Sequence, residues 1–94
     1  MVKITWTKKA VKDLNIIFEY ISKDSEFYAL NQINNIFRKI DVLQHHPRIG
    51  RIIPEKGVET LRELISGNYR IFYKINSPES VSVLRIHHSS RKVK

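Results

Sequence analysis

The sequence predicts an α+β domain with the element order β-α-α-β-β-β, in which a helical hairpin packs on a mostly antiparallel four-stranded sheet. Three observations lead to this fold class. Two neighbouring segments in the first half of the chain place apolar residues at helical spacing. Four further segments alternate between apolar and polar residues, or are nearly continuously apolar, as strands are: residues 2–6, 61–65, 69–75 and 81–88. Gly, Asn, Ser and Pro mark the turns between the last three segments.

The 94 residues form one domain, residues 1–94, and 41% hydrophobic residues suffice for one core. The formal net charge is +8, and it is uneven: residues 1–44 contribute +2 and residues 45–94 contribute +6. We therefore expect the basic surface mainly on the second half. Such a surface favours an anionic partner: nucleic acid, an acidic protein or a membrane surface. The alternative is a solvated basic face that only aids solubility.

The absence of cysteine excludes disulfides and zinc-thiolate sites and fits a cytoplasmic protein. The N-terminus has no long apolar region of the kind found in signal peptides. No run approaches the roughly 18 apolar residues that span a bilayer, and no basic amphipathic helix supports a role at a membrane surface. We expect no metal and no cofactor.

Both predicted helices carry an apolar stripe. Thr7 is a plausible N-cap for the first, and Asp24 or Ser25 for the second. The connection is short, so the two helices should lie antiparallel. His45 and His46 are expected to close the second helix and Pro47 to stop it. The stripes consist of Ala10, Val11, Leu14, Ile17, Phe18 and Ile21, and then of Ala29, Ile33, Ile36, Ile40 and Leu43.

The predicted strands differ in how they are covered. The first, with Val2, Ile4 and Trp6 on one face, could be an exposed edge. Residues 48–57 read as a loop because of their Gly and Pro content. In the segment 69–75, one face is apolar and contains Tyr69 and Tyr73, which we expect in the core. The opposite face should be largely cationic, with Arg70, Phe72 and Lys74.

The last strand is apolar enough to be central in the sheet. Strict alternation would place His88 with Leu84 and Ile86, and His87 with Arg85 and Val83. The two histidines would then point in opposite directions, which argues against their binding one metal ion together. Residues 89–94 follow as a basic tail that we expect to be flexible.

An ordered set of motifs along nearly the whole chain resembles the RelE/ParE superfamily of bacterial toxins from type II toxin–antitoxin pairs. These motifs are Trp6, Ala10–Leu14, Ile17–Ile21, Leu43, Pro47–Arg51, Arg62–Leu64, Gly67–Ile71, Tyr73, His88 and Arg91. The superfamily fold is β-α-α-β-β-β, in agreement with the pattern above.

The resemblance implies a cytoplasmic toxin that causes growth arrest and is neutralised by a cognate antitoxin, in a toxin–antitoxin hetero-oligomer. ParE-like members inhibit DNA gyrase, whereas RelE-like members cut mRNA on the ribosome without metal. The motif around Arg62 and Tyr69 and the pair His88 and Arg91 favour the ParE-like branch. An inactive relative that retains only antitoxin binding is the third alternative.

The resemblance also yields candidate site residues. If the protein is an endoribonuclease, the catalytic candidates are His87, His88, Arg91 and Glu63. Imidazole titrates near neutral pH and can act as base or acid, with Glu63 as its partner. For phosphate or target binding, the candidates are Arg62, Arg70, Arg85 and Lys56. The sequence leaves open which face of the sheet carries Arg62.

Overall fold

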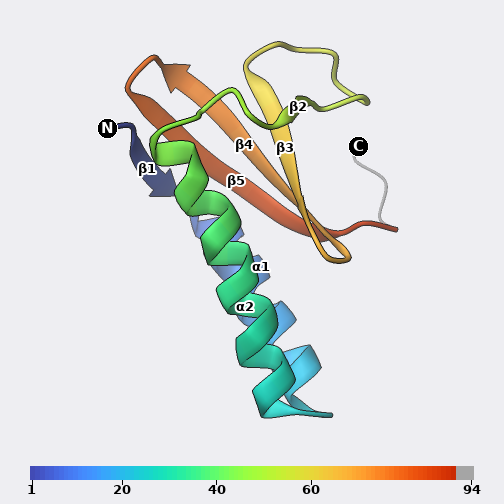
Figure 1. Cartoon of the computed structure of the whole chain (residues 1–94). Coiled ribbons are helices and arrows are strands. Elements are labelled where there is room, and N and C mark those ends of the chain that lie inside the picture. Colours follow the sequence, from blue (N-terminus) through green and yellow to red (C-terminus); the bar gives the residue numbers. More distant parts are fainter. Residues whose placement is uncertain (91–94) are drawn as a thin grey trace.

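The computed structural model describes residues 1–90 and confirms the α+β class (Figure 1). Its sheet has five strands rather than the predicted four, because residues within the expected loop form the short strand β2. The elements are β1 (Lys3–Trp6), α1 (Lys8–Ser22), α2 (Glu26–Asp41), the 3-10 turn η1 (Val42–Gln44), β2 (Arg51–Ile52), β3 (Leu61–Ser66), β4 (Tyr69–Ser77) and β5 (Ser80–His88).

The two helices begin at hydroxyl caps. The Thr7 hydroxyl accepts a hydrogen bond from the Ala10 amide, and the Ser25 hydroxyl accepts one from the Tyr28 amide. Each cap satisfies an amide that lacks a partner inside its helix. The second helix ends at Asp41, before the predicted boundary, and η1 follows it. The adjacent pair His45 and His46 is therefore exposed beyond η1 and does not close α2.

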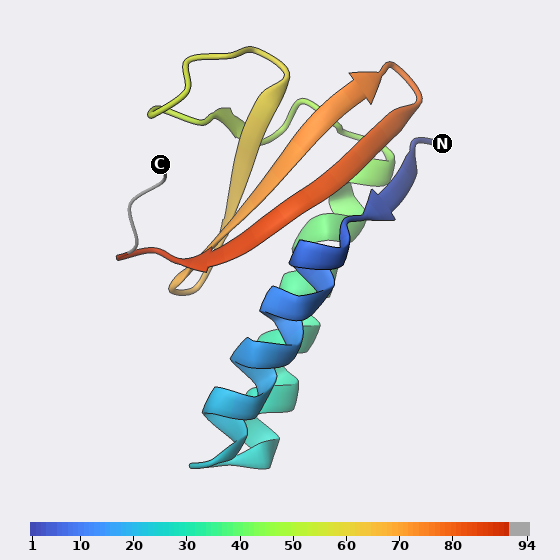
Figure 2. The same cartoon turned by 180° about the vertical axis from the view of Figure 1, so that it is seen from behind.

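The strand order β1-β5-β4-β3-β2 makes the first and last strands neighbours. β1 pairs parallel with β5, and the other strand pairs are antiparallel. β5 is thus an interior strand, as predicted, and β1 is an edge strand. Figure 2 shows β1 running beside β5 on the side of the sheet that leads into α1.

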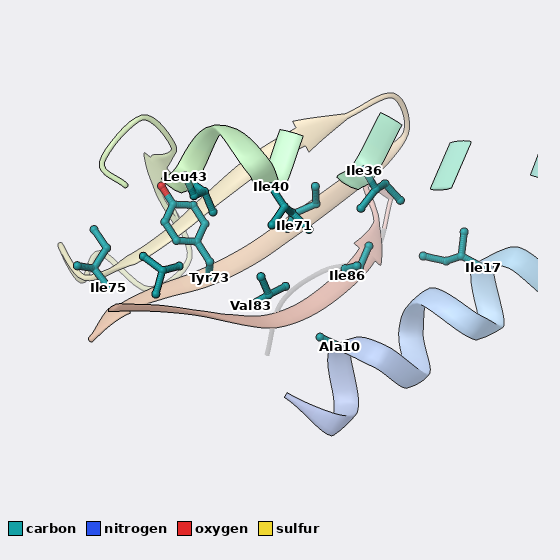
Figure 3. Packing of buried hydrophobic residues seen from close by; sticks show 11 residues of the cluster. Ala10, Ile17, Ile36, Ile40, Leu43, Ile71, Tyr73, Ile75, Val83 and Ile86 are labelled. Atoms are coloured by element: carbon teal, nitrogen blue, oxygen red, sulfur yellow. The ribbon is translucent and has the colours of Figure 1, made fainter. Parts of the chain in front are cut away.

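The core lies between the helices and one face of β4 and β5 (Figure 3). It contains eleven buried side chains: Ala10, Ile17, Ile36, Ile40, Leu43, Ile71, Tyr73, Ile75, Val81, Val83 and Ile86. Burial of one Ile or Leu side chain contributes about 1.5–3 kcal/mol, so the helical stripes and the apolar strand faces account for most of the hydrophobic stabilisation. The core assignment of Tyr73 is confirmed, and Tyr69 packs against the edge of the same cluster.

A β-bulge in β5 changes the predicted alternation. Phe72 pairs with Arg85 but Tyr73 pairs with Val83, so Leu84 is an extra residue. Val83 and Ile86 consequently both face the core. The prediction that Val83 shares a face with His87 was therefore wrong, because strict alternation does not survive a bulge.

The helical hairpin is longer than the face it covers. Figures 1 and 2 show that the end carrying the α1–α2 connection extends past the sheet. Within residues 1–90, no helix is long and apolar enough to cross a membrane.

Candidate functional site

The sheet face away from the helices carries several of the predicted site residues. In β4, Ile71 and Tyr73 face the core, so Arg70 and Phe72 between them point to the opposite face. Glu63 of β3 is paired with Phe72 and lies on that same face. Arg70 and Phe72 are buried, not part of an open cationic surface as predicted, whereas Lys74 is exposed.

A network of ion pairs explains how Arg70 can be buried. The Glu63 carboxylate, 1% exposed, accepts hydrogen bonds from Arg70 Nε at 2.9 Å and Nη2 at 2.5 Å. It also accepts one from Arg51 Nε at 2.5 Å. The Glu55 carboxylate, from the connection between β2 and β3, accepts from both terminal nitrogens of Arg70 at 2.8 Å. Two carboxylates and two guanidiniums thus neutralise one another in this network.

The network shifts the titration of its members. The hydrogen bond from Arg70 lowers the pKa of Glu55 to about 2. Reciprocally, the hydrogen bond to Glu55, with Glu63 as a second acceptor, raises the pKa of Arg70. The Arg70 guanidinium also lies 4.9 Å from the centre of the Phe72 ring, in cation–π geometry. Arg70 is therefore permanently charged and is engaged on every side by groups of its own chain.

The Glu55–Arg70 pair predicts a specific loss of stability in acid. The folded-state pKa of Glu55, about 2, lies below its usual 4.5. The pair therefore contributes to stability above that usual value, and the contribution disappears as the pH falls towards 2. In Glu55→Gln this contribution is absent at every pH. The difference in unfolding free energy between wild type and E55Q, measured by urea titration, should be constant near neutral pH and vanish in strong acid.

The control for this titration is Glu79→Gln. Glu79 is exposed, and no ion pair joins it to another residue within 1–90. Its substitution removes a charge but no bond, so wild type and E79Q should follow each other closely. A constant gap between wild type and E55Q down to the lowest pH would show that the pair does not contribute in the folded state.

Arg62 of β3 lies between β2 and β4, where it pairs with Ile52 and Tyr73, and it holds the connection before β2. Because Arg62 pairs with Tyr73, its side chain lies on the sheet face that the helices cover. The sequence had left open which face carries it. Its guanidinium donates to the backbone carbonyls of Glu59 at 2.9 Å, Arg48 at 3.1 Å and Gly50 at 2.9 Å. Within the described chain Arg62 forms no ion pair with a carboxylate, so its charge is not neutralised.

The connection that Arg62 holds is also fastened from inside. The buried Tyr73 hydroxyl donates to the Pro47 carbonyl at 2.7 Å and accepts from the Gly50 amide at 3.0 Å. Burial raises the pKa of Tyr73, so its hydroxyl stays protonated and can donate. These bonds fix the path by which the chain enters β2.

Arg85 is bonded to the first helix. Asp13 accepts from Arg85 Nε at 2.8 Å and Nη2 at 3.2 Å, and from the Ile86 amide at 3.0 Å. Burial alone would raise the pKa of Asp13, but these hydrogen bonds outweigh it, and the pKa lies below its usual value. The pairing of β1 with β5 ends at Val83, and beyond this point Asp13 takes the place of a neighbouring strand by accepting from the Ile86 amide. Arg85 therefore does not stand free on the far sheet face.

The two adjacent histidines have different neighbours. His87 lies edge-on to Phe72 with ring centres 5.3 Å apart, and His88 lies edge-on to Tyr69 at 5.5 Å. Since Phe72 and Tyr69 are on opposite faces of β4, the rings point in opposite directions, as predicted. In residues 1–90 no three His, Cys, Asp or Glu side chains are grouped so that they could hold a metal ion.

Lys56 and Arg91 complete the set of predicted site residues. Lys56 is exposed in the connection between β2 and β3, next to Glu55 in sequence. Arg91 and most of the predicted flexible tail lie outside the described residues, and Ser89 and Ser90 form a turn after β5. The roles predicted for Lys56 and Arg91 stay predictions.

The sequence analysis did not identify the partners of these arginines. Glu55 and Asp13 come from separate segments, and nothing in their spacing points to Arg70 or Arg85. One signal was available for Glu63, because it lies within a predicted strand. A carboxylate in a strand needs a cationic partner if its face of the sheet is covered.

A cleft of about 440 Å³ opens between α1 and the end of β5. It is lined by Ile16, Ile17 and Tyr20 of the helix and by Tyr69, Ile86, His87 and His88 of the sheet, with Asp13 at its margin. Among the sheet residues that line the cleft, His88 is exposed, whereas Tyr69 and His87 are partly buried and Ile86 is buried.

Comparisons with known proteins identify the fold and the family. The family model described as "ParE toxin of type II toxin-antitoxin system, parDE" matches residues 4–93. Toxin RelE2 of Caulobacter vibrioides is 32% identical over 92 residues, covering 97% of this chain and 99% of that protein.

Two solved structures share the fold. A chain of the chromosomal ParDE system from P. aeruginosa is 24% identical, with a TM-score of 0.76 over 94% of this chain and 96% of that one. A chain of the archaeal RelE–RelB complex from Pyrococcus horikoshii is 18% identical, with a TM-score of 0.66 over 97% and 98%. With a family model matched over almost its full length, this chain belongs to the ParE toxins of type II toxin–antitoxin systems, within the RelE/ParE superfamily.

Proposed function

We propose that this toxin arrests growth by inhibiting DNA gyrase and that a cognate antitoxin neutralises it. The observation that supports gyrase inhibition over RNA cleavage is the ion-pair network of Glu63, Arg70, Arg51 and Glu55. Of the predicted catalytic and phosphate-binding residues, Glu63 and Arg70 are bonded to each other and to Arg51 and Glu55.

RNA cleavage by the neighbouring 2′-hydroxyl needs a base for the hydroxyl proton, an acid for the leaving oxygen, and cations for the charge on phosphorus. As a base, Glu63 would have to release two guanidiniums and reach solvent from a buried position. As a phosphate ligand, Arg70 would have to release two carboxylates. We infer that both residues, and Arg85 with its partner Asp13, stabilise the fold instead.

The antitoxin part of the proposal is supported by charge and by the family. The solved ParDE and RelE–RelB systems each combine two proteins. A net charge of +8 suits an acidic wrapping segment. The edge strand β1 offers unpaired backbone groups to which such a segment could add a strand.

The test is pulse-labelling of bacteria just after controlled induction of this chain alone, combined with a supercoiling assay on purified gyrase. We expect thymidine incorporation to fall first, a DNA damage response to follow, and supercoiling to stop in vitro. Co-expression of the antitoxin should restore growth.

The other outcomes identify the alternatives. If leucine incorporation falls first and mRNA is cut, the toxin is a nuclease, and Arg91→Ala should abolish cutting while antitoxin binding persists. If neither synthesis falls, this chain is an inactive relative that keeps antitoxin binding.

A further inference from the structure

The free end of the helical hairpin exposes aromatic side chains. All four exposed Phe and Tyr side chains among residues 1–90 lie between residues 14 and 37: Tyr20, Phe27, Tyr28 and Phe37. Phe37 packs against Trp6 with the two rings tilted by 50°, but the other three are near the α1–α2 connection, with Phe27 82% and Tyr20 70% exposed. This end extends past the sheet (Figures 1 and 2).

The same segment has the opposite charge from the remainder of the chain. Residues 14–37 contain Glu19, Asp24 and Glu26 against Lys23, a net charge of −2, so the other 70 residues carry +10. The three carboxylates are exposed, and within residues 1–90 none of them forms an ion pair. Glu26 is favourable in the first turn of α2. Glu19 and Asp24 have no such structural explanation.

The exposed rings continue into the cleft beside β5. Tyr20 and Tyr69 both line the cleft, and Tyr28 bonds with Gln32 at 3.5 Å. Burial raises the pKa of Tyr69, and the charges of Tyr20 and Tyr28 raise it further. Within residues 1–90, the Gln32 side-chain oxygen is buried and has no hydrogen-bond partner.

Tyrosines and phenylalanines surrounded by carboxylates form a surface that suits a cationic protein partner. Arg and Lys side chains stack on aromatic faces and pair with carboxylates. Tyr is also enriched among the residues that dominate protein interfaces. An acidic antitoxin would be repelled here and attracted to the other, strongly basic part of the toxin.

We propose that the free end of the helical hairpin, around Tyr20, Phe27, Glu19 and Asp24, is the surface through which this toxin binds gyrase, by docking on a basic, DNA-binding surface of that enzyme. This inference rests on the function proposed above. A DNA-binding enzyme necessarily presents cationic surfaces, and the hairpin end has the complementary charge. The basic part of the toxin remains available to the antitoxin.

The experiment compares two double variants of the hairpin end in a gyrase supercoiling assay with the purified full chain. Tyr20→Ala with Phe27→Ala removes exposed rings and keeps good helix formers. Glu19→Lys with Asp24→Lys reverses the local charge. The matched controls are Ile49→Ala with Val58→Ala, which remove exposed apolar side chains elsewhere, and Glu79→Lys, which reverses a charge at the opposite end of the molecule. Circular dichroism and thermal melting verify that each variant is folded.

We expect both hairpin variants to need at least about tenfold more toxin for half-inhibition, because truncation or reversal at an interface centre has effects of this order. The charge-reversed variant should also lose the salt dependence of wild type. Both controls should stay within about twofold. Binding to the antitoxin encoded beside the toxin, measured by calorimetry, should stay within about threefold for all variants.

Three results would overturn the inference. If Y20A/F27A inhibits as well as wild type, the rings do not bind gyrase. If E19K/D24K inhibits more strongly, the partner surface is acidic. If antitoxin binding falls while gyrase inhibition persists, the hairpin end is an antitoxin surface. In each case wild type still inhibits gyrase, so the proposed function stands, whereas inactive wild type would refute both.

Discussion

Replacement of Glu63 by alanine is expected to lower the free energy of unfolding by about 3 kcal/mol. The substitution leaves the Arg70 guanidinium, with a side chain 9% exposed, paired only with Glu55 on its outer edge. Its Nε and the inner side of Nη2 lose their acceptor in a place that water hardly reaches. A buried charge that loses its partner typically costs 3–5 kcal/mol, and the remaining Glu55 pair puts the expected value at the lower end.

A control and a rescue separate this effect from a general loss of charge. Glu59→Ala breaks the pair with Arg48, whose side chain is 59% exposed, and should cost no more than about 0.5 kcal/mol. Combining Glu63→Leu with Arg70→Met replaces the buried charges by apolar groups of similar volume. We expect this double variant to recover to within about 1 kcal/mol of wild type, since buried ion pairs often bring little net stability.

Urea unfolding, followed by far-ultraviolet circular dichroism, measures all four proteins. A domain of this size has a total stability of about 5–15 kcal/mol, so a loss of 3 kcal/mol moves the midpoint clearly. If E63A lost as little as E59A, the far face would be open to water. The argument against Glu63 as a catalytic base would then lose its foundation.

Substitution of Gly50 by alanine should destabilise the protein by about 3 kcal/mol or more, the upper range for overpacking. A Cβ atom at this position would lie 2.5 Å from the Glu63 carbonyl oxygen and 2.6 Å from the Tyr73 hydroxyl. Both neighbours are fixed, one in the backbone of β3 and the other by its bonds to Pro47 and Gly50. To make space, the chain must move out of reach of the Tyr73 hydroxyl and the Arg62 guanidinium.

Gly67→Ala provides the matched comparison. Gly67 has φ +57° and more space around it, with Gln32 Oε1 at 3.5 Å as its nearest neighbour. An alanine there is strained by its backbone conformation alone, at a cost of about 1–2 kcal/mol. Thermal melting should therefore place G50A clearly below G67A. The reverse order would mean that the connection before β2 is soft and is not fixed by Tyr73.

The sequence predicted those helices and strands in which apolar residues recur at a regular spacing. The apolar stripes of α1 and α2 and the alternation in β4 are set by local geometry, which any buried face imposes on a chain. The order of the elements followed from the same patterns, and the family resemblance agreed with it. The short strand β2 has no such signal, because its two residues, Arg51 and Ile52, cannot show a period.

Two other features depend on contacts that sequence patterns do not record. The alternation in β4 correctly put Arg70 and Phe72 on the face opposite the core, but it could not show that the connection between β2 and β3 reaches this face through Glu55. The bulge at Leu84 shifts the facing of every residue before it relative to those after it. Such a shift arises from the pairing of β4 with β5 and leaves no mark in the composition.

The sequence predicted which residues belong to the candidate site, but not how they contact one another. Glu63, Arg70 and His87 do lie on one face of the sheet, as a nuclease would require. The sequence could not show whether these side chains are already bonded to other residues of the chain. Whether a guanidinium is available to a phosphate depends on Glu55 and Glu63, which lie 15 and 7 residues away from Arg70.

The pairing of β1 with β5 has a consequence for the synthesis of the protein. Lys3 is aligned with Ser80, so the first strand has to wait for nearly the whole chain before it finds its neighbour. Closing a loop of this length is slow, and β1 gains no strand hydrogen bonds until β5 is present. While β5 is still inside the ribosome, the core also lacks Val81, Val83 and Ile86. A growing chain therefore cannot hold the native fold before β5 has emerged, and we expect the toxin to become harmful only from that point, when an antitoxin already present can meet it as it folds.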